Sequence, residues 1–162
     1  MPLLKDGAEI GNAWTYLDGE AELKSEGAVT LPLGRFLAEA ETLAGRNAPV
    51  GVRLMPEDDA TLLVPFLEWI QLVEVSFPKY TDGRGYSQAQ LLRRRFGYKG
   101  ELRAVGHVLR DQIFYMNRSG FDAYETVRAD LSEVLDALND FRDAYQPAAD
   151  GRVPVFRQRH KN

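Results

Sequence analysis

The sequence contains no cysteine and only two histidines among its 162 residues. The lack of cysteine excludes disulfides, thiolate-bound zinc, cysteine-ligated iron–sulfur clusters and a thiol nucleophile. In any redox reaction, a non-covalently held cofactor or a partner protein would have to carry the electrons. From the residues themselves we predict no cofactor and no metal site.

The chain also lacks a long apolar run and an excess of positive charge. No apolar segment approaches the ~20 residues that a membrane-spanning helix needs. The apolar part of residues 1–9 is too short for a signal peptide. The net charge of −4 argues against non-specific binding of nucleic acid. We therefore predict a cytoplasmic protein that binds neither membranes nor nucleic acids.

The length and the apolar content are those of one globular domain. Hydrophobic residues make up 44% of the chain and charged residues 27%, which is ordinary for a soluble fold with a real core. We predict a single α/β domain over residues 1–150, with a weakly patterned N-terminal segment at 1–28. The remaining residues, 151–162, are basic and are expected to form a loose tail.

Strand patterns and helix patterns alternate along the chain. The expected strands are 13–17, 29–31, 50–54, 69–77, 102–105 and 121–126. The expected helices are 33–44, 61–66, 87–96, 108–119 and a last one that opens at Asp130 and stops at Pro147. A repeat of roughly 20 to 25 residues is typical of βα units and a mainly parallel sheet. The sheet is either open or curled as part of a barrel.

In parallel α/β sheets, ligands bind beyond the carboxyl ends of the strands. Applied to the four strands after residue 49, this rule selects the segments 55–57, 78–86, 106–112 and 125–128. We expect these segments to lie along one edge of the sheet, which we call the rim.

The segment from Thr81 to Ser87 has the composition of an anion-binding turn. Glycines such as Gly83 and Gly85 let backbone N–H groups face outward, and a helix N-terminus attracts anions. Arg84 adds a bidentate partner for phosphate, sulfate or carboxylate. The predicted anion-binding residues are Asp82, Gly83, Arg84, Gly85, Ser87, Arg110 and Gln112. The alternative is a tight turn in which Asp82 caps the helix and Arg84 is solvated.

A dinucleotide site is disfavoured by the same residues. The full fingerprint is G-x-G-x-x-G, and here the third glycine is replaced by Gln88. The acidic residue expected at the end of the next strand is replaced by Gly106 and His107.

Three other groups of charged side chains have a functional and a structural interpretation. His107 and Asp111 would pair as a general base and its orienting group if His107 lay in the first turn of a helix. Otherwise Asp111 complements the helix N-terminus. The acids at 57–59 suit a helix N-terminus better than a divalent metal, and the arginines at 93–95 are expected to be solvated at a helix end.

The block DGRGYSQAQLLRRRFGYKGELRAVGHVLRDQIFYMNRSGFDAYE, from Asp82 to Glu125, resembles the signature of a bacterial family called domain of unknown function 934. Genes of that family commonly lie beside those for sulfite reductase and the adenylylsulfate reductases. The resemblance therefore implies a role in assimilatory sulfate reduction but supplies no catalytic residues. It points to Asp82, Gly83, Arg84, Gly85, Ser87, Arg93, Gly97, Gly100, Glu101, Arg103, Gly106, Arg110, Asp111 and Gln112.

Three interpretations of the function remain open at this point. The first is an accessory or partner protein of sulfite reductase with an anion-binding rim. The second is an enzyme or carrier that acts on a small oxyanion or nucleotide at the same rim, using Arg84, His107, Arg110 and Asp111. The third is a structural subunit. Assembly of several copies of the chain is compatible with all three.

Overall fold

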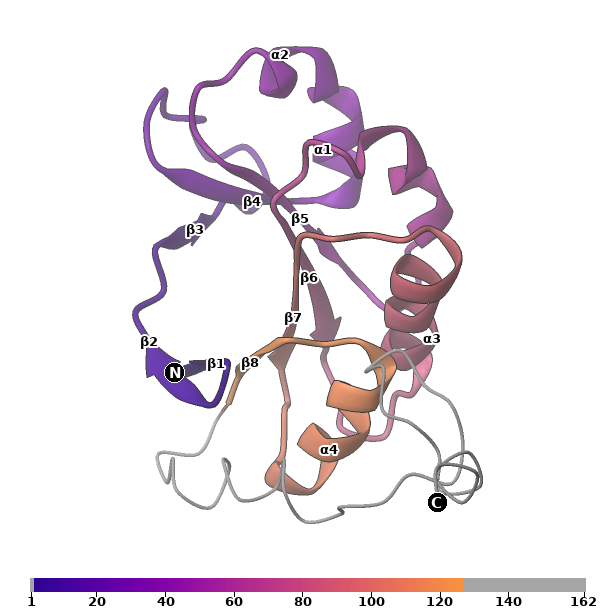
Figure 1. The fold of residues 1–162 in the computed structure, drawn as a ribbon. Helices are drawn as coiled ribbons and strands as arrows, with labels where there is room; N and C mark the ends of the chain where they lie inside the picture. Colours follow the sequence, from indigo (N-terminus) through magenta and orange to yellow (C-terminus); the bar gives the residue numbers. More distant parts are fainter. Residues whose placement is uncertain (1, 127–162) are drawn as a thin grey trace, which may run out of the picture.

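The computed structural model describes residues 2–126. Its strands are β1 (Leu3–Lys5), β2 (Ala8–Ile10), β3 (Trp14–Tyr16), β4 (Ala28–Pro32), β5 (Val50–Leu54), β6 (Leu72–Phe77), β7 (Glu101–Gly106) and β8 (Ala123–Glu125) (Figure 1). Its helices are α1 (Leu33–Ala38), α2 (Ala40–Ala44), α3 (Arg84–Gln90) and α4 (Arg110–Ser119), with a 3₁₀ helix η1 (Ala60–Phe66) and a π-helical turn η2 (Leu91–Arg95).

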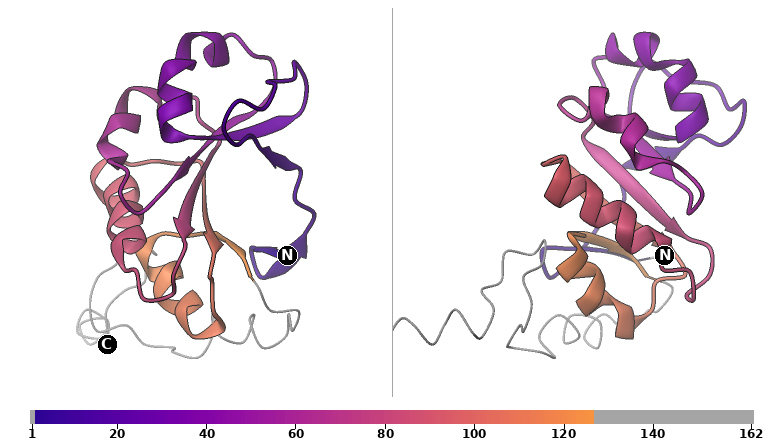
Figure 2. Two further views of the ribbon diagram at one scale, coloured as in Figure 1. Left: turned by 180° about the vertical axis from the view of Figure 1, so that it is seen from behind. Right: turned by 90° about the vertical axis from the view of Figure 1, so that its right-hand side faces the viewer.

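The strands form one sheet in the order β2-β1-β8-β7-β6-β5-β4-β3. The six strands from β3 to β8 are parallel and follow one another in chain order, while β1 is antiparallel to both β8 and β2. Each connection between two successive parallel strands has the same right-handed sense. Because the strand order does not reverse, all of these connections lie on the same face of the sheet. Accordingly, α1, α3 and α4 lie along one side of the sheet (Figures 1 and 2). The predicted α/β class with a mainly parallel sheet is confirmed.

The sheet is curled into a half-barrel, and the chain connectivity requires a strong curl. Its two edge strands, β2 and β3, are consecutive in the sequence and are joined only by residues 11–13. Four residue steps span at most about 14 Å, so the two edges approach each other at this connection. The sheet therefore has a convex face under the helices and a concave face on the other side.

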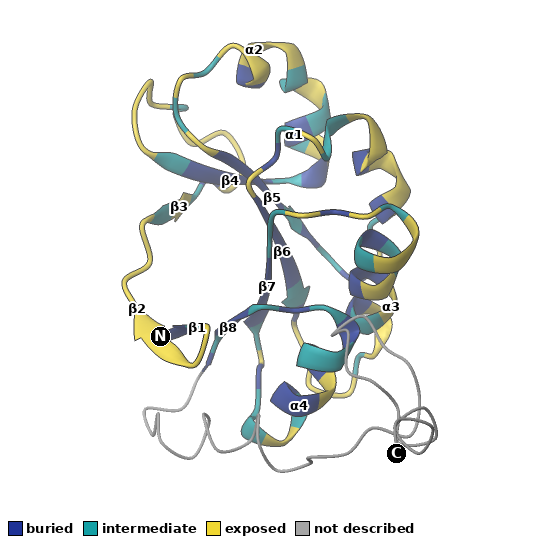
Figure 3. Cartoon of the chain, in the orientation of Figure 1, coloured by how far each residue is buried: buried dark blue, intermediate teal, exposed yellow. Residues whose placement is uncertain are grey.

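Side chains alternate between the two faces, as they must in a strand. Val52, Val73 and Leu102 face the helices and belong to the buried apolar core. The next residues along β5 and β6, Arg53 and Glu74, project from the concave face. Figure 3 shows that the central strands are buried, whereas β2 is exposed.

The N-terminal hairpin was not anticipated within the weakly patterned segment 1–28. Strands β1 and β2 are three residues each, too short to show an alternating pattern. They are joined by Asp6 and Gly7, whose φ values of 51° and 74° are those of a two-residue hairpin turn. The Asp-Gly dipeptide was the available signal for it.

Several predicted element boundaries are wrong. The helix predicted at 33–44 is interrupted at Glu39, between α1 and α2, and the strand predicted at 121–126 begins at Ala123. The strand predicted at 69–77 begins at Leu72, because the N–H groups of Trp69 and Ile70 donate to Phe66 and continue a turn. The helix predicted from a capping box at Ser87 begins three residues earlier, at Arg84. The helix predicted at 108–119 begins at Arg110.

The predicted helix ends at Gly97 and Gly120 are confirmed, since both glycines have a left-handed φ just beyond a helical segment. The predicted helix from Asp130, the rim residue Arg128 and the basic tail at 151–162 lie outside the described residues.

Candidate functional site

The rim is formed as the topology rule predicts. Strands β5, β6, β7 and β8 are adjacent and parallel, so the segments that follow them leave the same edge of the sheet. Gly106 ends β7 with φ 96°, and a Cβ there would lie 2.6 Å from the carbonyl oxygen of Phe77. The N–H of His107 donates to that same oxygen at 2.7 Å. The ends of β6 and β7 are thus locked together at the rim.

In the segment 81–87, Arg84 is paired with Asp82. Arg84 donates from Nε (3.0 Å) and Nη2 (2.7 Å) to the carboxylate of Asp82, and its backbone N–H donates to Asp82 Oδ1 at 3.1 Å. The side-chain hydrogen bond from Arg84 lowers the pKa of Asp82 to about 2. These contacts are those of the alternative interpretation, in which Asp82 caps the helix. Whether this loop binds an anion stays a prediction.

The two glycines of this segment do not use left-handed conformations. Gly83 has φ −83° and open space around it. Gly85 is buried inside α3, and a Cβ on it would lie 2.6 Å from the ring of Phe77 and 2.9 Å from Val75. Gly85 is therefore required for close packing of α3 on β6. Ser87 is exposed within the same helix.

Polar side chains at the rim hold neighbouring loops together. Gln112 accepts from the N–H of Leu109 at 3.2 Å and donates to the carbonyl of Tyr80 at 2.8 Å, which joins the start of α4 to the loop after β6. Gln88 donates to the carbonyls of Met55 (2.8 Å) and Asp58 (2.9 Å), which joins α3 to the loop after β5. The predicted neighbourhood of these loops is confirmed.

His107 does not lie in the first turn of a helix, which the proposed His107–Asp111 pair requires. Helix α4 begins at Arg110, so His107 lies before the first turn and does not share a helix face with Asp111. Asp111 is 89% exposed and lies 3.8 Å from Arg110. A catalytic role for either residue stays a prediction.

The concave face carries a row of alternating charges that the sequence analysis did not assign to a site. We call it the charge ladder; its members are Arg53, Glu74, Arg103, Glu101 and Lys5. Glu74 accepts from Arg53 Nε at 2.8 Å and lies 3.5 Å from Arg103 Nη1. Glu101 accepts from Arg103 Nη2 at 2.6 Å and from Lys5 Nζ at 2.8 Å. Glu74 and Arg103 are each only 1% exposed.

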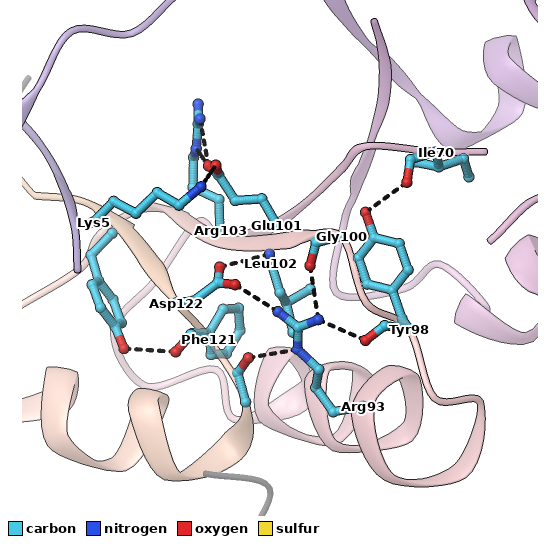
Figure 4. Close-up of polar contacts among 12 residues, drawn as sticks. Lys5, Ile70, Arg93, Tyr98, Gly100, Glu101, Leu102, Arg103, Phe121 and Asp122 are labelled. Carbon is cyan, nitrogen blue, oxygen red and sulfur yellow. Dashed lines mark hydrogen bonds and ion pairs between the residues drawn. The ribbon is translucent and has the colours of Figure 1, made fainter. Parts of the chain in front are cut away.

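The strand register explains how the ladder forms. Arg53, Glu74 and Arg103 are aligned on β5, β6 and β7, and Ala123 on β8 separates Arg103 from Lys5 on β1. The small side chain of Ala123 leaves room for Lys5 to reach Glu101 (Figure 4). Burial raises the pKa of Glu101, but the hydrogen bonds and charges of Lys5 and Arg103 outweigh that effect and hold it below its usual value.

The N-terminal segment also contacts the ladder at its middle, Arg103, and at one end, Arg53. Asn12, in the connection between the two sheet edges, accepts from Arg103 Nη1 at 3.1 Å. Tyr16 on β3 lies under the guanidinium of Arg53, with 3.8 Å between the guanidinium carbon and the ring centroid. Thr30 lies on the same face, opposite Tyr16 and Gly51, and its Oγ1 is buried without a hydrogen-bond partner among the described residues.

On the convex side of β7, Arg93 is an anchor rather than a solvated helix end. It donates to the carbonyls of Gly120 (2.9 Å), Tyr98 (2.7 Å) and Gly100 (2.8 Å), and to Asp122 at 2.9 Å (Figure 4). The prediction of a solvated Arg93 is wrong, because the loop after the π-helical turn brings two carbonyls to its guanidinium and the end of α4 brings the third. Arg94 and Arg95 are exposed as predicted.

A groove of about 570 Å³ lies at the opposite end of the sheet from the rim. It is lined by the segments that precede β6 and β7, including Trp69, Gln71, Phe96 and Lys99. Ligands of parallel sheets bind at the other end of the strands, so we give the rim and the concave face more weight.

Two further observations bear on the kind of site. Within residues 2–126, no three carboxylate or imidazole side chains lie close enough together to hold a metal ion. Over the same residues, no helix is both long enough and apolar enough to cross a bilayer.

The described part of the chain is therefore a half-barrel of βα units, with polar loops at the carboxyl ends of its strands and a charged concave face. The chain belongs to the family of bacterial proteins of unknown function DUF934, whose model matches residues 51–156. This confirms the resemblance seen in the block from Asp82 to Glu125. No curated protein matches the chain.

Proposed function

We propose that this protein is a cytoplasmic accessory protein of assimilatory sulfate reduction that works with sulfite reductase and binds a small oxyanion at the carboxyl end of its sheet. Family membership supports the pathway, because genes of this family commonly lie beside those for sulfite reductase. The missing cysteines support an accessory role, since the chain has no thiol with which to hold or transfer electrons.

One observation carries the oxyanion part of this proposal. The carboxyl ends of β5 to β8 are aligned at one edge, where parallel α/β sheets bind their ligands. Arginine side chains lie at that edge or next to it, on β5, at the start of α3 and at the start of α4. Arginine suits sulfite and sulfate because its planar fork donates two parallel hydrogen bonds to an oxyanion.

The partner role is tested by mixing the purified protein with sulfite reductase from the same bacterium. We expect the two to elute together in size-exclusion chromatography and the rate of sulfite turnover to change. Two separate peaks with an unchanged rate would contradict the partnership. A strain without the protein should grow more slowly than its parent on sulfate and equally well on cysteine.

The ligand role is tested by thermal unfolding in sodium sulfate or sodium sulfite, against sodium chloride of equal ionic strength. A ligand at one hundred times its Kd stabilises a folded protein by roughly 2.7 kcal/mol. Equal melting temperatures in all three salts would contradict oxyanion binding while leaving the partnership with sulfite reductase to its own test.

A further inference from the structure

We propose that the oxyanion binds on the concave face of the half-barrel and that the guanidinium of Arg53 is the group that holds it. This inference rests on the proposed function and narrows the site, at the carboxyl end of the sheet, to Arg53 near the end of β5. The ligand class is a small oxyanion with two oxygens able to accept from one arginine, such as sulfite or sulfate.

The concave face is charged at positions that are apolar in closed barrels. The interiors of closed βα barrels are filled mainly by branched apolar side chains. Here the equivalent positions on three neighbouring strands are Arg53, Glu74 and Arg103. Buried ion pairs are often no better for stability than apolar side chains of the same volume. A buried row of charges therefore calls for an explanation other than stability.

The charges of the ladder do not cancel. Its three cations, Lys5, Arg53 and Arg103, face two anions, Glu74 and Glu101. Each carboxylate lies between two cations, so the ladder carries one net positive charge and ends in a cation on both sides. An anion bound at one end would complete the alternation.

Arg53 has hydrogen-bond donors that no described residue uses. Its Nε donates to Glu74, but its two terminal amino groups make no hydrogen bond to any residue between 2 and 126. Its side chain is 22% exposed, so Arg53 is not sealed from solvent as Glu74 and Arg103 are. Arg103 has no such freedom, because it is buried and donates from all three of its nitrogens.

The guanidinium of Arg53 is held in place by two neighbouring side chains. Glu74 fixes its Nε from one side, and the ring of Tyr16 lies against its plane at 3.8 Å. A fixed fork loses little conformational entropy on binding. Nearby on the same face, the unpartnered Oγ1 of Thr30 is a hydroxyl still in need of a hydrogen-bond partner.

Arg84 at the rim is a weaker candidate for the same role. Its side chain already donates two hydrogen bonds to Asp82, and that carboxylate would repel an incoming anion. At Arg84 one terminal amino group is taken up by Asp82, whereas at Arg53 neither terminal amino group makes a hydrogen bond to any residue between 2 and 126.

The test is isothermal titration calorimetry of the full chain with sodium sulfate and with sodium sulfite at constant ionic strength. Arg53→Gln should weaken binding of the better anion at least tenfold, and Arg53→Lys should restore only part of the affinity because lysine lacks the fork. Arg94→Gln, a change at an exposed arginine, should leave the affinity within twofold of the wild type.

If Arg53→Gln fails to fold, NMR of the wild-type protein provides a second test. In the wild-type protein, the side-chain ¹⁵N resonances of Arg53 should shift as sulfate is added and saturate with the calorimetric affinity. Unmoved Arg53 resonances at saturation would overturn the inference.

The remaining outcomes separate this inference from the proposed function. Loss of binding in Arg84→Gln with full binding in Arg53→Gln would overturn the location and keep the oxyanion role. No heat with either anion in the wild type would overturn both the location and the oxyanion role. Co-elution with sulfite reductase would then still support the accessory function.

Discussion

Glu74 of β6 accepts a hydrogen bond from Arg53 of β5 at 2.8 Å, although Glu74 is 1% exposed and Arg53 still reaches solvent. The pair connects the buried centre of the concave face to its open side. Because Glu74 also faces Arg103 at 3.5 Å, one carboxylate balances two guanidinium groups. Glu74 is therefore the shared counter-charge of Arg53 and Arg103.

Replacing Glu74 by glutamine should lower the free energy of unfolding by about 3 kcal/mol, because two cations then lack their shared counter-charge in a buried setting. Urea unfolding followed by circular dichroism measures the change. The matched control is Glu22→Gln, at an exposed loop position, which should stay within about 0.5 kcal/mol of the wild type. A Glu74→Gln protein as stable as the control would show that the ladder contributes nothing to folding.

The three neighbouring arginines at 93–95 offer a second matched comparison. Arg93→Met removes four hydrogen bonds and leaves the carbonyls of Tyr98, Gly100 and Gly120 without their donor. An unsatisfied buried polar group costs about 1–3 kcal/mol; since Arg93 is still 15% exposed, we expect a total loss of about 3 kcal/mol. Arg94→Met should change the free energy of unfolding by less than about 0.5 kcal/mol. Equal stability of the two variants would refute the anchoring role.

Much of the fold was predictable because it depends on local patterns. The strand at Val50–Leu54 has the predicted bounds, and the helix ends at Gly97 and Gly120 follow from their left-handed backbone. The boundaries that failed depend instead on individual local hydrogen bonds, such as those from Trp69 and Ile70 to Phe66. Helix α3 starts at Arg84 because Asp82 satisfies its N–H, which hydrophobic periodicity does not reveal.

The rim was predictable for a topological reason, whereas the charge ladder was not predicted. The rule for parallel sheets needs only the strand ends, and these were approximately right. The ladder depends on strand register, which aligns Arg53, Glu74 and Arg103. A signal did exist: in each of these strands one charged residue stands between two apolar ones, with signs that alternate from strand to strand. The contribution of Asn12 and Lys5 could not be found this way, because both come from the N-terminal segment that folds back on the sheet.

The two glycines of the rim loop, Gly83 and Gly85, should respond differently to replacement by alanine. Gly85→Ala should lower the free energy of unfolding by about 2 kcal/mol, because its Cβ would lie 2.6 Å from a ring atom of buried Phe77. Gly83→Ala should be neutral or stabilising by up to about 1 kcal/mol, since φ is −83° and no atom lies within 4 Å of the new Cβ. Thermal and urea unfolding of both variants measures the difference. A neutral Gly85→Ala variant would mean that α3 moves away from β6 at no cost.

The Asp82–Arg84 pair should be visible as a pH effect with a definite sign. Because hydrogen bonds from Arg84 lower the pKa of Asp82 from 3.8 to about 2, the ionised carboxylate stabilises the fold above pH 3.8. This contribution is lost as the pH falls toward 2. In carboxyl ¹³C NMR, Asp82 should titrate with a midpoint near 2 in the wild type and with a higher midpoint in Arg84→Gln, which loses the side-chain hydrogen bonds but keeps the one from the backbone N–H, while Arg94→Gln leaves the midpoint unchanged. The difference in melting temperature between the wild type and Asp82→Asn should be constant above about pH 4.5 and should vanish toward pH 2. A wild-type midpoint near 3.8 would show that Arg84 is free in solution, and the argument for Arg53 as the better oxyanion ligand would lose its contrast.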